Sequence, residues 1–211
     1  VVIERDDRLS ALCRKAANEP VAPFPPKDDD PDTPCVILYT GGTTGVPKGA
    51  MITHFNIISN LKSGREFSIQ LVPKGEHIGF LGAVPFYHII GLVGVMLFTA
   101  EFESTVYLVP DPRKFESILQ IIDKNKINIM HGVPTLFRAI LKEPSFHEYD
   151  MSSLRIILSG AAALPPELAE EMEEKFRTLI VEAYGMTETS PIISSNPFEK
   201  ENRKLGSIGI P

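Results

Sequence analysis

The sequence has few cysteines, no apolar run long enough to span a membrane, and no excess of positive charge. Its two cysteines, Cys13 and Cys35, exclude a disulfide framework or a metal cluster and indicate inert or buried thiols in a reducing compartment. The longest apolar run, residues 89–100, is too short to cross a bilayer. A net charge of −6 argues against nucleic-acid binding, which usually requires a basic patch.

The remaining composition is that of a globular protein. The 211 residues are 43% hydrophobic and 23% charged, which allows one large domain or two small ones. We find no signal-peptide pattern and expect a cytoplasmic location, with peripheral membrane association left open. Prolines and an acidic run mark residues 18–34 as a linker. We therefore predict that residues 1–34 are the end of a preceding element plus this linker, and that residues 35–211 form one α/β domain.

Apolar runs that indicate strands alternate with stretches of helical periodicity. The predicted strands are residues 35–39, 78–84, 104–109, 127–130, 154–158 and 179–181, and the predicted helices are 54–67, 89–100, 112–125 and two that begin at 134 and 165. This alternation predicts an α/β fold with a mostly parallel sheet flanked by helices. Ligands of such sheets bind beyond the carboxyl ends of the strands. We therefore expect three loops, residues 40–49, 159–164 and 182–189, to converge on one ligand.

The first of these loops has the composition of an anion-binding loop. Residues 40–48 hold three glycines, three threonines and one lysine, directly after a predicted buried strand. Glycines let backbone N–H groups approach an anion closely, and Lys48 adds a compact positive charge. A Walker loop would need Gly-Lys-Ser/Thr, but Pro47 precedes Lys48 and Gly49 follows it, which disfavours a kinase. An ordinary glycine-rich turn stays open as the alternative.

Four segments together resemble the acyl-adenylate-forming (AMP-binding) superfamily, which includes acyl-CoA synthetases, luciferases and the adenylation domains of peptide synthetases. They are residues 39–49, 85–91 (Pro-Phe-Tyr-His-Ile-Ile-Gly), 159–163 (Ser-Gly-Ala-Ala-Ala) and 184–188 (Tyr-Gly-Met-Thr-Glu). Their order and approximate spacing match the family over nearly the whole chain from about residue 30. The Thr-Gly-Gly at 40–42 and the segment 190–211 are similar to the long-chain fatty-acid CoA ligases.

The resemblance implies a reaction and its site. A fatty acid would be activated with ATP to acyl-AMP and then joined to coenzyme A as a thioester, with Mg²⁺ bound by Glu188 and the acyl carboxylate near His88. The implied catalytic residues are Thr43, Lys48, His88 and Glu188. The implied nucleotide-binding residues are Thr40, Gly41, Gly42, Thr43, Thr44, Gly45, Lys48, Gly160, Ala161, Ala162, Glu182, Ala183, Tyr184, Gly185, Met186 and Thr187.

Several of these residues also have an interpretation that involves no ligand. Glu188 taken alone fits a surface charge, and His88 taken alone fits a helix-start histidine satisfied by the backbone. Gly91 and Gly94 leave room for an acyl chain but equally suit close helix–sheet packing. Glu182 stands where many relatives have glutamine, which puts a hydrogen bond to adenine in doubt. The other histidines, His54, His77, His131 and His147, are interpreted as structural or exposed.

Family members are much longer than this chain. A ribose-binding aspartate, a hinge and a C-terminal domain with a catalytic lysine find no match here, so we expect the central segment of an N-terminal domain that is inactive or weak on its own. Two alternatives stay open. One is an aryl-acid ligase of the coumarate type. The other is a non-catalytic fragment that only binds nucleotide or associates with itself through exposed apolar surface.

Overall fold

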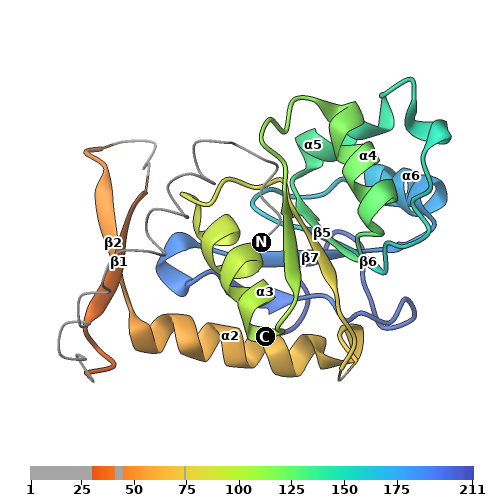
Figure 1. Cartoon of the computed structure of the whole chain (residues 1–211). Helices are drawn as coiled ribbons and strands as arrows, with labels where there is room; N and C mark the ends of the chain where they lie inside the picture. The colour runs from red at the N-terminus through yellow and green to blue at the C-terminus, as the bar shows by residue number, and fades with distance from the viewer. Residues whose placement is uncertain (1–29, 41–44, 74) are drawn as a thin grey trace.

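The computed structural model describes residues 30–40, 45–73 and 75–211, and a six-stranded sheet forms its centre (Figure 1). The strand order is β4 (Thr105–Leu108), β3 (Gly79–Gly82), β5 (Ile129–Gly132), β6 (Ile156–Ser159), β7 (Leu179–Gly185) and β8 (Ile192–Ser195). Neighbouring strands are parallel except β8, which runs antiparallel to β7. The predicted α/β fold with a mostly parallel sheet is confirmed.

Three amphipathic helices cover one face of this sheet. They are α4 (Phe115–Asn125), α5 (Pro134–Leu141) and α6 (Pro166–Phe176), with the short 3₁₀ turn η3 (Phe146–Glu148) after α5. Their apolar stripes form the largest core cluster together with inward-facing strand residues. Proline occupies the first turn of α5 and of α6, where its missing N–H has no helical partner to lose.

The opposite face is covered by helices from the first half of the chain. These are α2 (His54–Ser68), which ends in η1 (Ile69–Leu71), and the π-helical η2 (Ile90–Leu97), which continues into α3 (Phe98–Glu101). Thr53 and Asn56 form a reciprocal cap at the start of α2, with bonds of 3.2 and 3.0 Å. The helix predicted over residues 89–100 exists, but its apolar sequence gave no sign of π-type hydrogen bonding.

The strands on either side of the predicted anion-binding loop form a hairpin outside the six-stranded sheet. Strand β1 (Pro34–Thr40) pairs antiparallel with β2 (Lys48–Thr53), a strand that the sequence analysis missed. The strand predicted over residues 35–39 exists, but its predicted burial is wrong, because Ile37 is 57% exposed and Tyr39 is 76% exposed. An apolar run does not by itself distinguish an exposed hairpin from a buried parallel strand. Of the predicted preceding element and linker over residues 1–34, residues 1–29 lie outside the described residues.

The second half of the sheet also differs from the prediction in its boundaries. Strands β5 and β6 lie one to two residues later than expected. Strand β7 runs to Gly185, so the predicted loop over residues 182–189 is wrong in its first half; a short turn, η4 (Thr187–Thr189), follows. Residues 192–195, expected as a polar tail, form β8. In the described ranges, no helix has the length and apolar character needed to cross a membrane.

One histidine is buried within the sheet. His131 lies on β5 with only 9% of its surface exposed. In the register of the parallel pair it faces Leu158, and Gly94 of η2 packs close to its ring. Burial lowers the pKa of the His131 imidazole to about 4, because the charged form is poorly solvated there. The ring is therefore neutral at pH 7.

We expect the substitution Phe137→Ala to destabilise the protein by about 3–5 kcal/mol, since it removes a fully buried ring from the main core and leaves a cavity. The matched control is Phe55→Ala on α2, where the ring is 58% exposed, and it should change stability by less than about 0.5 kcal/mol. Urea denaturation of the two variants measures the difference. Equal effects would contradict the described core.

His131 should make the protein acid-sensitive. The unfolded chain takes up this proton near pH 6.5 and the folded chain only near pH 4, so the free energy of unfolding falls as the pH drops below 6.5. The loss reaches about 3 kcal/mol once the pH is below 4. Urea denaturation at pH 7 and pH 4.5 should show a smaller acid loss for His131→Leu than for the wild type. The same change at the exposed His147 serves as control.

Candidate functional site

The carboxyl ends of β6 and β7 bring two of the predicted loops together. Ser159 pairs with Glu182, so the segments that follow them start side by side. A Cβ on Gly160 would lie 3.6 Å from the carbonyl oxygen of Ala183, which shows how closely the two backbones approach. Ala161 has a φ of 64°, a left-handed conformation that is unfavourable for a residue with a Cβ and that clusters at ligand sites. Ala162 is exposed beside it.

The Tyr-Gly-Met-Thr-Glu motif spans the end of β7 and the η4 turn. Tyr184 pairs with Ser194 of β8 and keeps 41% of its surface exposed. Gly185 admits no side chain, because a Cβ there would lie 1.8 Å from the carbonyl oxygen of Pro191. Glu188 is exposed in η4 and forms no ion pair with any residue in the described ranges. The motif therefore presents one aromatic face and one free carboxylate.

The hairpin carries part of the predicted phosphate loop. Thr40 ends β1 opposite Lys48, which begins β2, and the Thr40 hydroxyl donates to the Lys48 carbonyl oxygen at 3.3 Å. Gly45 is exposed with open space around it. The predicted residues Gly41, Gly42, Thr43 and Thr44 lie outside the described residues. Strand β2 contacts η4, so the hairpin and the turn that holds Glu188 are neighbours.

His88 stands between two cavities. Its Nδ1 accepts a hydrogen bond from the Ile90 N–H at 3.2 Å. The backbone contact that the sequence analysis considered as an alternative for His88 is therefore present at one of its ring nitrogens. Because Nδ1 accepts, the neutral ring carries its proton on Nε2. The exposed His88 side chain thus retains one N–H donor, and it lines both cavities.

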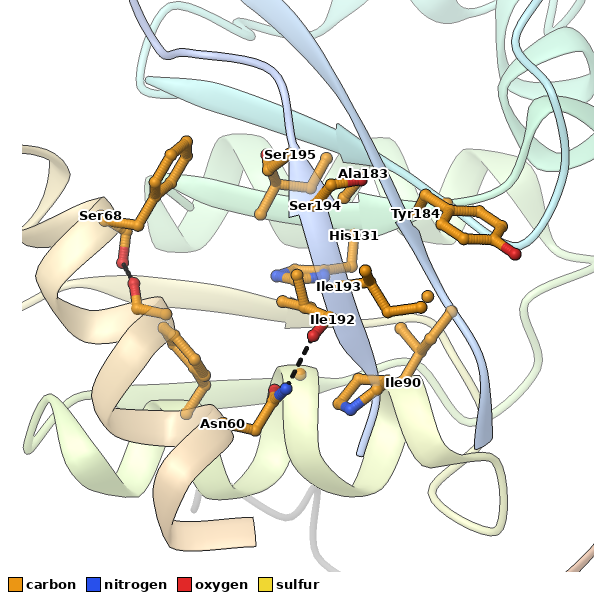
Figure 2. A pocket seen from close by; sticks show the side chains of 18 of the residues that line it. Asn60, Ser68, Ile90, His131, Ala183, Tyr184, Ile192, Ile193, Ser194 and Ser195 are labelled. Atoms are coloured by element: carbon orange, nitrogen blue, oxygen red, sulfur yellow. Dashed lines mark hydrogen bonds between the residues drawn. The ribbon is translucent and has the colours of Figure 1, made fainter. Parts of the chain in front are cut away.

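The first cavity has a volume of about 540 Å³ and lies between α2, η2 and the open face of the sheet (Figure 2). Its mouth includes Gly160, Ala161 and Tyr184, and its interior is formed largely by aromatic and aliphatic side chains. No Asp, Glu, Lys or Arg is among the described residues that line it. A space of this size and character suits an apolar ligand.

The second cavity, of about 520 Å³, adjoins the first. The two share His88, Ile90, Gly132 and Ala161, and the second is bounded further by Val133 and other residues around the start of α5. Of the two glycines considered for acyl room, Gly94 lines the first cavity. Gly91 instead allows close packing, since a Cβ there would lie 2.1 Å from the Pro85 carbonyl oxygen.

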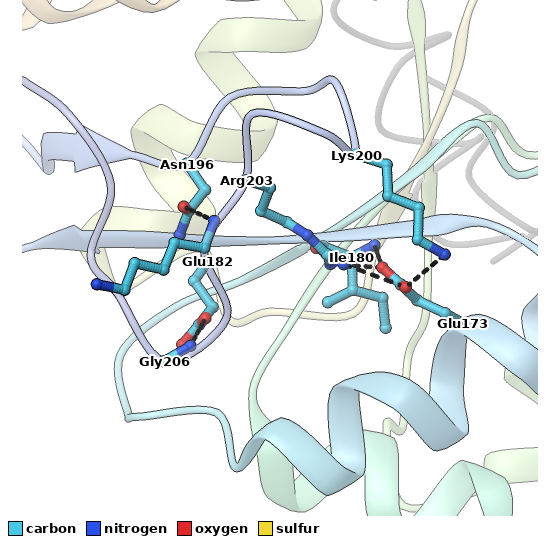
Figure 3. A network of polar contacts seen from close by, with 8 residues as sticks. Glu173, Ile180, Glu182, Asn196, Lys200, Arg203 and Gly206 are labelled. Atoms are coloured by element: carbon cyan, nitrogen blue, oxygen red, sulfur yellow. Dashed lines mark hydrogen bonds and ion pairs between the residues drawn. The ribbon is translucent and has the colours of Figure 1, made fainter.

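Glu182 is already engaged within the protein (Figure 3). Its Oε2 accepts a hydrogen bond from the Gly206 N–H at 2.8 Å. Nearby, the nearly buried Arg203 side chain pairs with Glu173 and also donates to the Ile180 carbonyl oxygen. These contacts fix the segment after β8 against β7. The Glu182 carboxylate therefore has a structural role within the protein, which agrees with the doubt that it forms a hydrogen bond to adenine.

Two cavity residues were missed by the sequence analysis. Asn60 on α2 lines the first cavity and was not considered, and His131 was interpreted only as structural or exposed. No pattern in the sequence singled out Asn60. His131 directly follows the apolar residues of the predicted strand 127–130, so a strand extended by two residues would have placed it at the carboxyl end, where ligands bind.

The chain resembles known proteins over its whole length. A family model described as "AMP-binding enzyme" matches residues 1–211. The chain is 38% identical to a long-chain-fatty-acid–CoA ligase of Bacillus subtilis over 203 residues, which is 95% of this chain and 35% of that protein. The chain therefore spans about a third of the length of this curated relative.

Solved structures give the same result. The structure of ATP-bound MatB from Rhodopseudomonas palustris matches with a TM-score of 0.79 and 30% identity, covering 95% of this chain and 38% of that one. O-succinylbenzoate coenzyme A synthetase (MenE) from Bacillus subtilis, in complex with AMP, matches with a TM-score of 0.71 and 30% identity, covering 86% of this chain and 36% of that one. The order of motifs, the fold and both kinds of comparison agree, and the chain belongs to the AMP-binding enzyme family.

Proposed function

We propose that the protein containing this chain activates a fatty acid with ATP to an acyl adenylate and then transfers the acyl group to coenzyme A. The observation that carries this proposal is the uncharged, largely apolar cavity of about 540 Å³ that opens beside His88, Ala161 and Tyr184. A ligase for a fatty acid needs an apolar space that ends at the nucleotide site. The curated relative from Bacillus subtilis, named as a long-chain-fatty-acid–CoA ligase, supports the same substrate class.

The described residues fit an adenine nucleotide at the mouth of this cavity. The exposed ring of Tyr184 offers a stacking face, and Gly160 and Ala161, which have small or no side chains, line the same cavity. The hairpin with Thr40 and Lys48 lies next to η4, so phosphates bound by the loop would be near Thr187 and Glu188. The MatB and MenE structures are described as ATP-bound and AMP-bound, which supports a nucleotide here.

Glu188 suits a magnesium ion that is bound mainly through the nucleotide. No group of three or more His, Cys, Asp or Glu side chains in the described residues could form a metal site by itself. Mg²⁺ commonly takes one or two carboxylates together with phosphate oxygens and water, and Glu188 is an exposed carboxylate without a partner in the described ranges. When bound, the ion would neutralise phosphate charge during the attack of the acid on the α-phosphorus.

His88 would orient the carboxylate of the acid. Its Nε2–H is a free donor at the junction of the two cavities, while Nδ1 is held by the Ile90 N–H. Bringing a carboxylate and a triphosphate together requires positioning and charge neutralisation, and the residues around the junction would supply both. The second cavity reaches this junction from another side and is a path by which the thiol of coenzyme A would approach the adenylate.

Acid-dependent exchange of pyrophosphate into ATP tests the proposal. With the full-length protein, saturated fatty acids should support exchange at least tenfold better than aryl acids, because the lining of the first cavity is uncharged and largely apolar. Best exchange with an aryl acid would replace the fatty-acid assignment by the coumarate-type alternative. No exchange with any acid by a folded protein would favour the non-catalytic alternative.

The substitution Glu188→Gln should lower kcat/KM for ATP by roughly 100-fold and raise the magnesium concentration needed for half-maximal exchange, since it removes the only charge of that side chain. Glu170→Gln on the exposed surface of α6 removes the same charge far from η4 in the sequence and is the control. Exchange rates measured over a magnesium titration separate the two. Equal rates in both variants would exclude Glu188 from metal binding.

A further inference from the structure

His131 is a buried polar group whose ring faces the first cavity without a hydrogen-bond partner in the described ranges. It projects from β5 toward the side of the sheet covered by α2 and η2, and 9% of its surface is exposed (Figure 2). A Cβ on Gly94 would lie 3.8 Å from its Cε1, so η2 packs directly against the ring. The ring nitrogens form no hydrogen bond in the described ranges and are not fully enclosed, so a ligand in the cavity can reach them.

Asn60 presents a second unpaired atom to the same cavity. Its Nδ2 donates to the carbonyl oxygens of Ile192 at 2.9 Å and Thr189 at 3.3 Å, so both amide hydrogens are used. These two bonds fix the orientation of the amide. Its Oδ1 is buried and has no partner, and it is therefore an acceptor held in place. Asn60 comes from α2 and His131 from the sheet, on opposite walls of the cavity.

The serine hydroxyls labelled around the cavity in Figure 2 are satisfied by the backbone. Ser68 donates to the Gly64 carbonyl oxygen at 2.6 Å, Ser194 to Ile208 at 2.9 Å and Ser195 to Asn196 at 3.1 Å. The lining contains no charged side chain among the described residues. A ligand in this cavity therefore meets largely apolar walls, the imidazoles of His88 and His131, the fixed amide oxygen of Asn60 and the unpaired hydroxyl of Ser159.

We propose that the acyl pocket is selective for a fatty acid that carries a hydroxyl group on its chain, recognised by His131 and Asn60. A hydroxyl both donates and accepts, so it can donate to Asn60 Oδ1 and accept from the His131 N–H. This inference rests on the proposed fatty-acid ligase function and narrows its substrate class. An unsubstituted chain leaves both groups unpaired. A second carboxylate has no hydrogen to give Asn60 and meets no cation on the described lining.

The test uses the full-length protein and a series of fatty acids of one length, unsubstituted or with a single hydroxyl moved along the chain. The measured quantity is kcat/KM for acid-dependent exchange. One hydroxyl position should exceed the unsubstituted acid by roughly tenfold or more, since the hydroxyl pairs groups that otherwise stay unsatisfied. Preference for the unsubstituted acid over every hydroxylated one would overturn the proposal.

Variants identify the residues responsible. His131→Leu should abolish the preference by lowering kcat/KM for the hydroxylated acid while leaving that for the unsubstituted acid equal or higher, and His131→Gln should restore part of it. Ile129→Val, on the same strand and the same cavity wall, changes the lining without removing a polar group and should leave the ratio of the two acids unchanged. An unchanged ratio in His131→Leu would also overturn the proposal.

The two proposals fail in different ways. Exchange with unsubstituted fatty acids and no hydroxyl preference would reject the selectivity alone and keep the ligase function. No exchange with any fatty acid would reject the ligase function and the selectivity with it.

Discussion

The parallel pairing of β5, β6 and β7 is the constraint on which the site depends. Parallel neighbours need crossover connections, and α5 and α6 make two of them on one face of the sheet. All three strands therefore end at the same edge of the sheet. Gly132 and Ser159 are the last residues of β5 and β6, and Tyr184 lies near the end of β7. The other face is left to α2 and η2, whose packing against the strands leaves the cavity beside that edge.

Much of this architecture follows from local sequence. The amphipathic stripe of α4 and the prolines that begin α5 and α6 specify helices by periodicity and backbone geometry. The exposed hairpin did not follow, because β1 has the apolar composition of a buried strand and only its pairing with β2 reveals its position. Strand β8 was missed for a different reason: it is a short Ile-Ile-Ser-Ser segment whose strand structure depends on pairing with the end of β7.

The residues of the site also divide into positions that the sequence predicts and positions that it does not. A glycine of the motif has a clear backbone reason, because a Cβ on Gly185 would lie 1.8 Å from the Pro191 carbonyl oxygen. The positions of Asn60 and His131 could not be predicted, since they acquire meaning only when α2 and β5 face each other across a cavity. Such residues depend on tertiary packing, and no local period or spacing distinguishes them from ordinary helix and strand positions.

Asn60 also joins parts of the molecule that are distant in the sequence. Its two donor bonds fasten the middle of α2 to the residues on either side of the Ser190–Pro191 peptide, directly after η4. The same helix begins at His54, directly after Thr53, the last residue of the hairpin. The hairpin and the turn that holds Glu188 are thereby connected through one helix as well as by their direct contact. The loss of the Asn60 amide would remove the side-chain part of this connection without touching the hairpin or Glu188.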